Sequence, residues 1–399
     1  MLFSALLALG VTASATVLFV ADYSGNITSL SLTHSNGNYS LEAIHTNDGC
    51  APNPSWLTID PARGHLYCLN EGLTSPNGSL ASFSINSDGS LKQITNQTTP
   101  NGPVSGVIYG EPAGQRAIAL AHYGGSGVSS YLLSPDGNVT FNQEMFYNLT
   151  EPGADPDRQD APHVHEVITD PTGQYILAPD LGADLVRVYC WDIETLELKE
   201  LDPLKVEAGT GPRHAAFWSP YSLTGSGDLY FYLVGELSAT VTAYKVTYKS
   251  DNDGLSFTEI QHEESDWLFN IPQRNAPAEI HVSPDNRFLI VSNRNDTTFT
   301  LPNAIGKSDS IATWQLNEKN GNMIFHQLWP AGGSYPRHFT TNAIGSLVAV
   351  GYQMSEAVAI LSRDVQSGLI GEPVARIPIA GNVTAVVWYE ERALGVLGA

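Results

Sequence analysis

One pattern recurs seven times along this chain: a β-like run, a polar residue, a few small or turn-forming residues, and a second β-like run. The copies include IALAHYGGSGVSSY from Ile118, YILAPDLGADLVRVY from Tyr175 and FYLVGELSATVTAY from Phe231. Aligned on the polar residue, successive copies lie 49 to 59 residues apart. The aligned residues are Asp22, Glu71, His122, Asp180, Glu236, Arg294 and Gln353. Self-similarity at a fixed period of this length indicates a repeat architecture.

Most units carry four short strand signals. A strand ending in a turn precedes the aligned pair, as in WLTIDPARG from Trp56, and a strand pair with Asp-Gly or Asn-Gly turns follows, as in INSDGSLKQI from Ile85. Four strands in about fifty residues is typical of a propeller blade. We therefore predict an all-β, seven-bladed β-propeller with four-stranded antiparallel blades. The low charged fraction, 15 %, with 36 Gly and 24 Pro, agrees with a β-rich protein.

The first unit lacks a leading strand, whereas the C-terminus carries a spare one, TAVVWYEE from Thr384. Pairing this strand with residues 17–21 would close the ring and remove a sheet edge. We therefore expect the two ends of the chain to meet in one blade.

Residues 1–15 have the pattern of a secretory signal peptide, a short apolar run followed by Ala13-Ser14-Ala15. Removal of this segment would leave residues 16–399 as a single propeller domain. Eight Asn-x-Ser/Thr sequons fit a glycosylated secretory protein, so we expect secretion and N-glycosylation. The sequons begin at Asn26, Asn38, Asn77, Asn96, Asn138, Asn148, Asn295 and Asn382.

Only three cysteines occur, and they do not have the spacing of metal ligands. Cys50 and Cys68 form the plausible disulfide, which leaves Cys190 as a buried thiol in an apolar strand.

The charge balance limits the partners of the protein. The chain has 19 basic and 41 acidic residues and a formal net charge of −22. A field of that sign repels phosphate backbones and anionic bilayers, so neither nucleic acid nor membrane is an expected partner. We expect a monomer that binds a small substrate. Basic residues that gather at one place stand out against this background.

In a propeller, the starts of the first strands and the ends of the second strands converge at one end of the central channel. Arg213, Arg294 and Arg337 fall at such positions. Guanidinium groups there suit a substrate that carries a carboxylate or a phosphate. The alternative is that each arginine pairs with a carboxylate of a neighbouring blade as part of the architecture.

Glu236 and His165 are candidates for acid and base work in the same channel, provided that their surroundings separate their pKa values. For the opening of a lactone, one would activate water while an arginine stabilises the oxyanion. His122 and His163 are further candidates for substrate binding, and a structural role is the alternative for both. The sequence contains no nucleophile elbow, zinc-binding helix, phosphate loop or dinucleotide fingerprint, so no metal and no cofactor are expected.

Four stretches carry a resemblance to a known family: HVHEVITDPTGQYILAPDLGADLVRVY from His163, GTGPRHAAF from Gly209, GELSATV from Gly235 and PDNRFLIVSNRND from Pro284. With them, residues 17–390 resemble the seven-bladed lactonase family, which joins propeller 6-phosphogluconolactonases with fungal carboxy-cis,cis-muconate cyclases. The resemblance implies a metal-free active site at one end of the channel. By motif, that site falls on His165, Arg213, Glu236 and Arg294, with Arg274 as a rival for the last.

These observations leave three functions open. The leading hypothesis is a hydrolase that opens a sugar or related lactone, for which a phosphorylated lactone is an unlikely substrate outside the cell. The second is a cycloisomerase of the muconate-cyclase type, which would use the same residues on an unsaturated carboxylate. The third is a propeller that binds a partner without catalysis.

Overall fold

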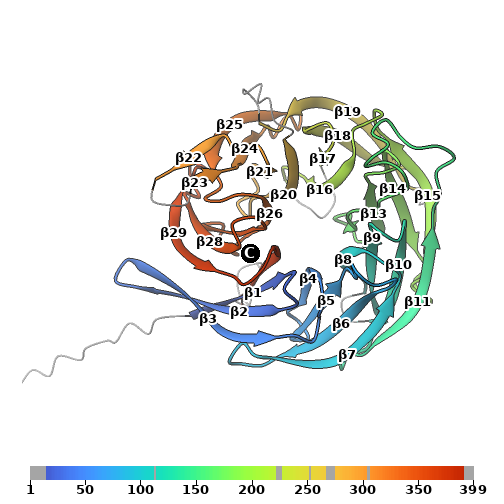
Figure 1. The fold of residues 1–399 in the computed structure, drawn as a ribbon. Coiled ribbons are helices and arrows are strands. Elements are labelled where there is room, and N and C mark those ends of the chain that lie inside the picture. The colour runs from blue at the N-terminus through green and yellow to red at the C-terminus, as the bar shows by residue number, and fades with distance from the viewer. Residues whose placement is uncertain are drawn as a thin grey trace, which may run out of the picture.

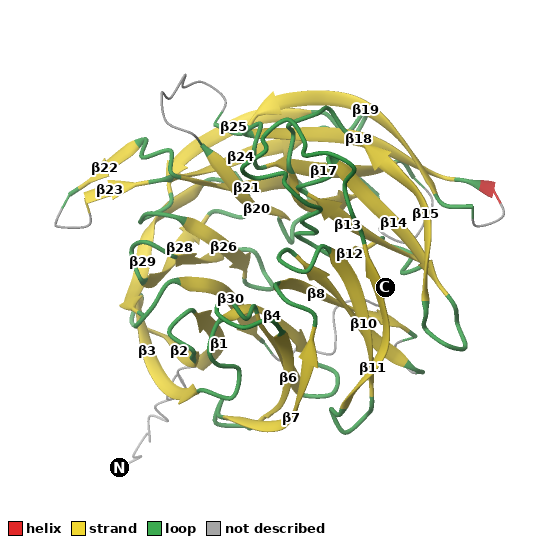
Figure 2. Cartoon of the chain, turned by 45° about the vertical axis from the view of Figure 1, so that its right-hand side comes forward, coloured by secondary structure: helices red, strands yellow, loops and turns green. Residues whose placement is uncertain are grey.

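The computed structural model describes residues 15–111, 114–221, 227–250, 253–266, 275–302 and 306–390. These residues form seven four-stranded antiparallel sheets, arranged as blades around a central channel (Figure 1). No α-helix occurs among them, and the one helical residue, Ser250, is in a 3₁₀ conformation and is drawn red in Figure 2. No helix of the described residues is long and apolar enough to cross a membrane. The prediction of an all-β, seven-bladed propeller is confirmed.

Each blade is given from the channel outward. Blade 1 consists of β30 (Val383–Tyr389), β1 (Ala15–Asp22), β2 (Ile27–Ser35) and β3 (Asn38–Asn47). Blade 2 consists of β4 (Pro54–Asp60), β5 (His65–Asn70), β6 (Gly78–Ile85) and β7 (Leu91–Thr99). Blade 3 consists of β8 (Pro103–Gly110), β9 (Arg116–His122), β10 (Gly127–Leu133) and β11 (Val139–Phe146). Blade 4 consists of β12 (Ile168–Thr169), β13 (Tyr175–Asp180), β14 (Leu185–Trp191) and β15 (Leu198–Lys205). Blade 5 consists of β16 (Pro212–Trp218), β17 (Leu229–Gly235), β18 (Thr240–Tyr248) and β19 (Leu255–Glu264). Blade 6 consists of β20 (Ala276–Val282), β21 (Phe288–Arg294), β24 (Ser310–Leu316) and β25 (Met323–Pro330). Blade 7 is β26 (Pro336–Thr341), β27 (Leu347–Tyr352), β28 (Ala357–Arg363) and β29 (Ile370–Pro378).

The ring closes as the sequence predicts. The last strand, β30, pairs antiparallel with the first, β1, from Val17 opposite Tyr389 to Asp22 opposite Val383. The pairing satisfies a strand edge that would otherwise be open. The predicted signal peptide lies almost entirely outside the described residues, and Ala15 is already part of β1.

The repeat alignment matches the strands. Four of the seven aligned residues, Asp22, His122, Asp180 and Arg294, are the last residue of the second strand of their blade. The other three, Glu71, Glu236 and Gln353, come directly after that strand. All seven aligned residues therefore mark the same place in the blade, as the repeat predicts.

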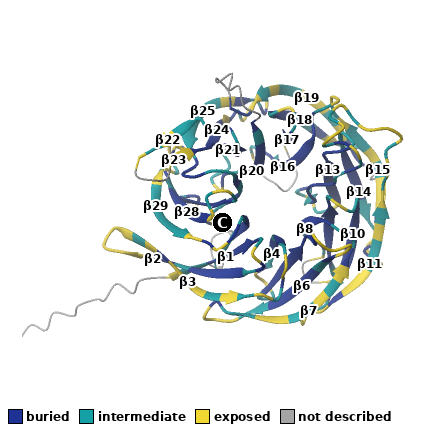
Figure 3. Ribbon diagram, in the orientation of Figure 1, coloured by how far each residue is buried: buried dark blue, intermediate teal, exposed yellow. Residues whose placement is uncertain are grey.

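The core is divided among the blade interfaces. The second strands β5, β9 (after its first residue), β13, β17, β21 and β27 are buried along their length, because each lies between two strands of its own sheet and two neighbouring blades (Figure 3). Seven hydrophobic clusters result, one between each pair of adjacent blades. Burial of apolar surface at every interface stabilises the ring as a whole.

The innermost strands share one irregularity that shapes the site. A register shift follows a proline near the start of five of them, at Pro54, Pro103, Pro212, Pro277 and Pro336. A proline is tolerated there because its missing N–H would face the channel and not a neighbouring strand. A bulge re-aims the side chains beside it, and Arg213, His214 and Arg337 lie within these shifts.

Two further expectations concern local features. Cys50 and Cys68 are joined in a disulfide, as predicted. Cys190 is the free cysteine, but it is half-buried rather than buried, because it lies at the end of β14, next to half-buried Trp191, whereas Val188 and Tyr189 earlier in the strand are fully buried. A short hairpin, β22 (Phe299–Leu301) and β23 (Gly306–Ser308), extends outward from blade 6 (Figure 2).

Candidate functional site

Three guanidinium groups converge on the carboxylate of Glu236. Arg158 Nη2 lies 2.7 Å from Oε1, Arg294 Nη2 lies 2.9 Å from Oε2, and Arg213 Nη1 donates to Oε2. Glu236 and Arg213 are buried, whereas the side chain of Arg158 is 35 % exposed. These residues come from the loop before blade 4 and from blades 5 and 6, so the predicted convergence of strand ends takes place here.

The arginines determine the charge of Glu236. Burial alone would raise the pKa of this carboxyl, but the guanidinium groups of Arg294 and Arg213 hold it well below its usual range. Burial and the neighbouring Arg294 lower the pKa of Arg213 to about 9, so this group remains charged at neutral pH. Glu236 is therefore a carboxylate fixed among cations.

A fourth arginine, Arg337, lies at the same end of the channel. Its Nη1 donates to the hydroxyl of Tyr23 over 2.9 Å, and that hydroxyl donates to Glu71. Burial raises the pKa of Tyr23 to about 12, so the phenol stays protonated. We call Arg158, Arg213, Arg294 and Arg337, with Glu236, the arginine mouth. The four guanidinium groups outnumber the two carboxylates at this end of the channel, Glu236 and Glu71, so this end carries an excess of positive charge.

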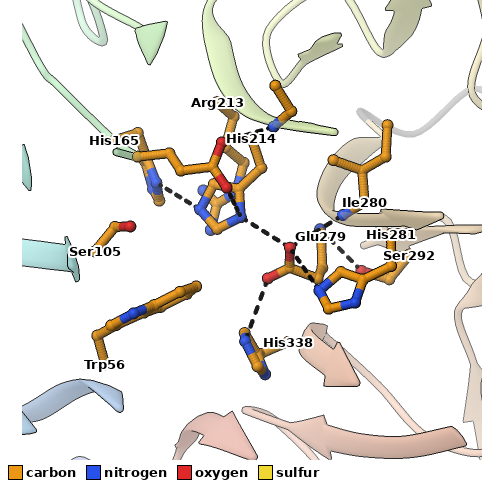
Figure 4. A network of polar contacts seen from close by, with 12 residues as sticks. Trp56, Ser105, His165, Arg213, His214, Glu279, Ile280, His281, Ser292 and His338 are labelled. Atoms are coloured by element: carbon orange, nitrogen blue, oxygen red, sulfur yellow. Dashed lines mark hydrogen bonds and ion pairs between the residues drawn. The ribbon is translucent and has the colours of Figure 1, made fainter. Parts of the chain in front are cut away.

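His165 begins a chain of hydrogen bonds that leads away from the arginine mouth (Figure 4). Its Nδ1 lies 3.2 Å from Nε2 of His214, and Nδ1 of His214 lies 3.1 Å from Oε1 of Glu279. Burial, Arg213 and His214 hold the pKa of His165 well below its usual range, so the ring is neutral. Trp56 packs edge-on against His214 on the other side of the channel.

The chain ends in a second polar cluster, formed by Glu166, His214, Glu279, His281 and His338, which we call the histidine–glutamate mouth. Glu279 lies 3.5 Å from Nε2 of His338 and 3.6 Å from Nε2 of His281. A cavity of about 780 Å³ opens here, lined by Glu166, Glu279 and both of these histidines. The channel therefore has an end of guanidinium groups and an end of carboxyl and imidazole groups, with His165 between them.

The structure brings five of the eight predicted site residues to one place: His165, Arg213, Glu236, Arg294 and Arg337. His122 is fully buried, with its ring nitrogens 3.2 Å from Asn101 O and 2.7 Å from Ser129 Oγ, so both are already engaged. His163 stacks on Tyr123 and contacts Asp160 at 2.9 Å. Both rings are engaged with neighbouring loops, and neither lies in the group around Glu236. Arg274 lies outside the described residues.

Sequence reasoning missed several residues of the two mouths. Arg158 lies in the loop between β11 and β12, outside the repeated unit, so the alignment could not include it. Tyr23 and Glu166 each directly follow a residue that the sequence patterns do mark, Asp22 and His165. Glu279 is the middle residue of β20, an innermost strand that lines the channel, but nothing in its sequence context gives it a role.

Comparisons with known proteins agree with the propeller fold. Residues 10–388 match the family described as "Lactonase, 7-bladed beta-propeller". The chain is 31 % identical over 356 residues to a probable 6-phosphogluconolactonase of Arthroderma benhamiae, covering 89 % of this chain and 84 % of that protein. It is 27 % identical to a 6-phosphogluconolactonase of Formosa agariphila, covering 83 % and 87 %.

Solved structures share the fold. A periplasmic gluconolactonase of Pseudomonas aeruginosa has a TM-score of 0.77 at 24 % identity, over 94 % of this chain and 99 % of that one. A putative 6-phosphogluconolactonase of Bacteroides fragilis has a TM-score of 0.76 at 23 % identity, over 94 % and 98 %. At this level of identity, the likeness is one of architecture.

Proposed function

This chain belongs to the lactonase family of seven-bladed β-propellers, and from that premise we propose that it hydrolyses a sugar-derived lactone at the arginine mouth, with His165 as the general base. The observation that carries the assignment is the hydrogen-bond chain from Glu279 through His214 to His165.

The direction in which the hydrogen bonds of this chain are donated follows from Glu279, the acceptor at its end. The carboxylate of Glu279 can only accept, so Nδ1 of His214 carries the proton between them. The other nitrogen of His214 is then an acceptor, and Nδ1 of His165 must donate to it. Nε2 of His165 is left with its lone pair, and no other described residue forms a hydrogen bond with it. A neutral imidazole held in this tautomer is suited to remove a proton from water.

The proposed reaction balances with groups of this chain. His165 Nε2 takes a proton from water, and the hydroxide adds to the lactone carbonyl carbon to form a tetrahedral oxyanion. The C–O bond of the ring then breaks, the imidazolium returns its proton to the leaving oxygen, and the product is a hydroxy acid. Arg213 and Arg337 lie on the channel wall beside His165 and supply positive charge for the oxyanion and for the carboxylate product.

Glu236 has a different role in this mechanism from the acid or base that the sequence predicts. A carboxyl whose pKa is held far below neutrality is a weak general base at pH 7. We assign it the placement of Arg158, Arg213 and Arg294. Because three guanidinium groups are committed to Glu236, few remain to grip a substrate with several carboxylates, which disfavours the cycloisomerase alternative.

We also propose that the protein is secreted and N-glycosylated, and that its substrate is an unphosphorylated lactone. Five sequon asparagines are exposed: Asn38, Asn77, Asn96, Asn138 and Asn148. Three are half-buried, and one of these, Asn382, donates its side-chain amide to Gln353 O over 2.9 Å. Peptide mapping of the secreted protein before and after glycosidase treatment tests this expectation.

The test of function is proton release by the purified protein against gluconolactone, 6-phosphogluconolactone and aliphatic lactones, above the spontaneous rate. We expect acceleration with the unphosphorylated sugar lactone. His165→Gln should lower kcat by about 10³-fold, since general base catalysis contributes roughly 10²- to 10⁴-fold. The matched variant His326→Gln changes a surface histidine on β25 and should keep full activity. Spontaneous rates with every lactone would contradict the proposal, and absorbance changes with muconates would then support the cycloisomerase.

A further inference from the structure

We infer that the histidine–glutamate mouth is a binding site for a divalent transition-metal cation, with Glu166, His214 and Glu279 as its ligands. One oxygen or nitrogen of each lies within 4.8 Å of the others, and all three side chains are buried. The three residues come from blades 4, 5 and 6, so a bound cation would join three neighbouring blades.

The charges of this cluster support a cation. Two carboxylates are buried here close to one imidazole, and within the described residues neither is ion-paired with a lysine or arginine. Glu236, at the other end of the channel, has three such partners. Buried carboxylates are normally paired or bound to a metal, because removing their charge from water is costly. A cation among Glu166, His214 and Glu279 would give both carboxyl groups a charged partner of the kind that Glu236 has.

One oxygen of the cluster has no hydrogen-bond partner. Oε2 of Glu279 accepts no hydrogen bond from any described residue, and the side chain is only 2 % exposed. The nearest donor is His338, whose Nδ1 accepts the N–H of Val386 over 3.2 Å, so that its proton is on Nε2, 3.5 Å from this oxygen. His338 therefore orients Glu279 from outside the cluster, as an outer partner of a metal ligand does.

Glu166 is oriented in the same way. Its Oε2 accepts the N–H of Ala215 over 2.7 Å, while Oε1 points toward Nδ1 of His214 at 3.9 Å. Nδ1 of His214 now shares its proton with Glu279. A cation would replace that proton, because metal ligands bind in their deprotonated form.

The cation has a route to the cluster and room for water. Glu166 and Glu279 both line the cavity of about 780 Å³ at this mouth. One imidazole nitrogen and two carboxylates, with the remaining positions open to solvent, is a ligand set that suits Zn²⁺ and related first-row cations. Mg²⁺ prefers oxygen ligands and should bind more weakly.

Binding would reach the arginine mouth through one hydrogen bond, a step that rests on the proposed function. If Nδ1 of His214 binds the cation, the proton of His214 lies on Nε2, which then donates to Nδ1 of His165. In a neutral His165, the proton moves to Nε2, and the ring loses the lone pair that removes a proton from water. The cation should therefore inhibit hydrolysis while leaving substrate binding intact.

The experiment uses the full chain without a histidine tag, dialysed against a chelator. Calorimetric titration with Zn²⁺ and Mn²⁺ should show one site, and Zn²⁺ at saturation should raise the melting temperature by about 2 °C or more. Glu166→Gln should weaken binding by about 100-fold. The matched variant Glu71→Gln, a buried glutamate at the opposite mouth, should bind as the wild type does, and melting curves establish that both variants fold.

Absence of heat and of a melting shift in the wild type, or equal binding by Glu166→Gln, would overturn the site. The activity readout is separate: Zn²⁺ should lower kcat about tenfold or more with KM unchanged, and Glu166→Gln should require about 100-fold more Zn²⁺. Binding without inhibition would refute the link to His165 and not the site. A wild type without lactonase activity in the absence of metal would refute the proposed function and leave the binding result standing.

Discussion

The two mouths of the channel each hold a buried glutamate just inside the ring, yet they differ in what surrounds it. Glu236 accepts from three guanidinium groups, which stay charged at neutral and acidic pH and have no tautomer that accepts a hydrogen bond. Glu279 is surrounded by the imidazoles of His214, His281 and His338, which are neutral when unprotonated and can exchange the nitrogen that carries the proton. A glutamate can therefore hold charged arginines in place at one end of the channel, whereas at the other end it belongs to a hydrogen-bond network whose protons can move between imidazole nitrogens.

The largest difference between the mouths should appear when each loses a carboxylate. Glu236→Gln leaves three guanidinium groups without their common partner, so we expect a loss of about 3 kcal/mol in the free energy of unfolding and about 100-fold in kcat/KM. Glu166→Gln removes a carboxylate that has no permanent cation as a partner and should cost less than about 1 kcal/mol. Urea unfolding and proton release measure both. Equal losses of stability in the two variants would remove the distinction between the mouths.

Acid sharpens the same comparison. The pKa of Glu236 is lowered in the folded state by Arg294 and Arg213, with further contributions from His165 and Arg158 that outweigh burial. The ionised Glu236 therefore contributes its full stabilisation at pH values above 4.5, the pKa of a glutamate in the unfolded chain. This stabilisation is lost as the pH falls through the lower pKa of the folded state. The stability gap between wild type and Glu236→Gln should stay constant from about pH 7 to about pH 5.5 and shrink below about pH 4.5. A gap that narrows already near neutrality would show that Glu236 is not held as an anion.

A smaller effect is expected from Glu279, which acts through His214 rather than on the substrate. Glu279→Gln should lower kcat by about tenfold with KM unchanged, because an amide can accept from His214 but fixes its tautomer less firmly. Steady-state kinetics with the chelator-treated protein separate the two constants. A rise in KM with kcat intact would place Glu279 in substrate binding and contradict its positioning role.

The smallest effect should come from Arg158. Its side chain is the most exposed of the three that contact Glu236, and exposed ion pairs contribute about 1 kcal/mol or less. Arg158→Gln should therefore raise KM by about fivefold and change kcat by less than about twofold. Arg158→Lys keeps the charge and should fall between the variant and the wild type. A large fall in kcat for Arg158→Gln would mean that this arginine stabilises the transition state.

The repeat makes the fold and part of the arginine mouth predictable from the sequence alone. Because each aligned residue lies at the end of the second strand of its blade, the repeat by itself places Glu236 and Arg294 at the channel. Arg213 and Arg337 follow from the strand starts after Pro212 and Pro336. The ring closure is predictable as well, whereas the spacing of three cysteines does not by itself determine which two form the disulfide.

The remaining part of the site depends on distances that a repeat does not encode. Arg158 lies in a loop whose path is set by contacts such as its hydrogen bond to the Tyr123 hydroxyl. The cluster of Glu166, His214 and Glu279 requires residues of three blades to point toward one another, and it has no spacing in sequence that marks a metal site. The role of Glu236 could not be assigned either, because it depends on how many guanidinium groups reach one carboxylate.

The closure of the ring by β1 and β30 sets a delay during synthesis. Thr384 Oγ1 donates to Ala21 O, a contact between residues 363 positions apart in the sequence. At about 5 to 20 residues per second, a ribosome needs about 20 to 70 s to make the chain between them. During that time, the free edge of β1 has no partner strand from its own chain. A chain that stops before Val383 keeps this edge permanently, which makes incomplete products of this gene prone to join one another.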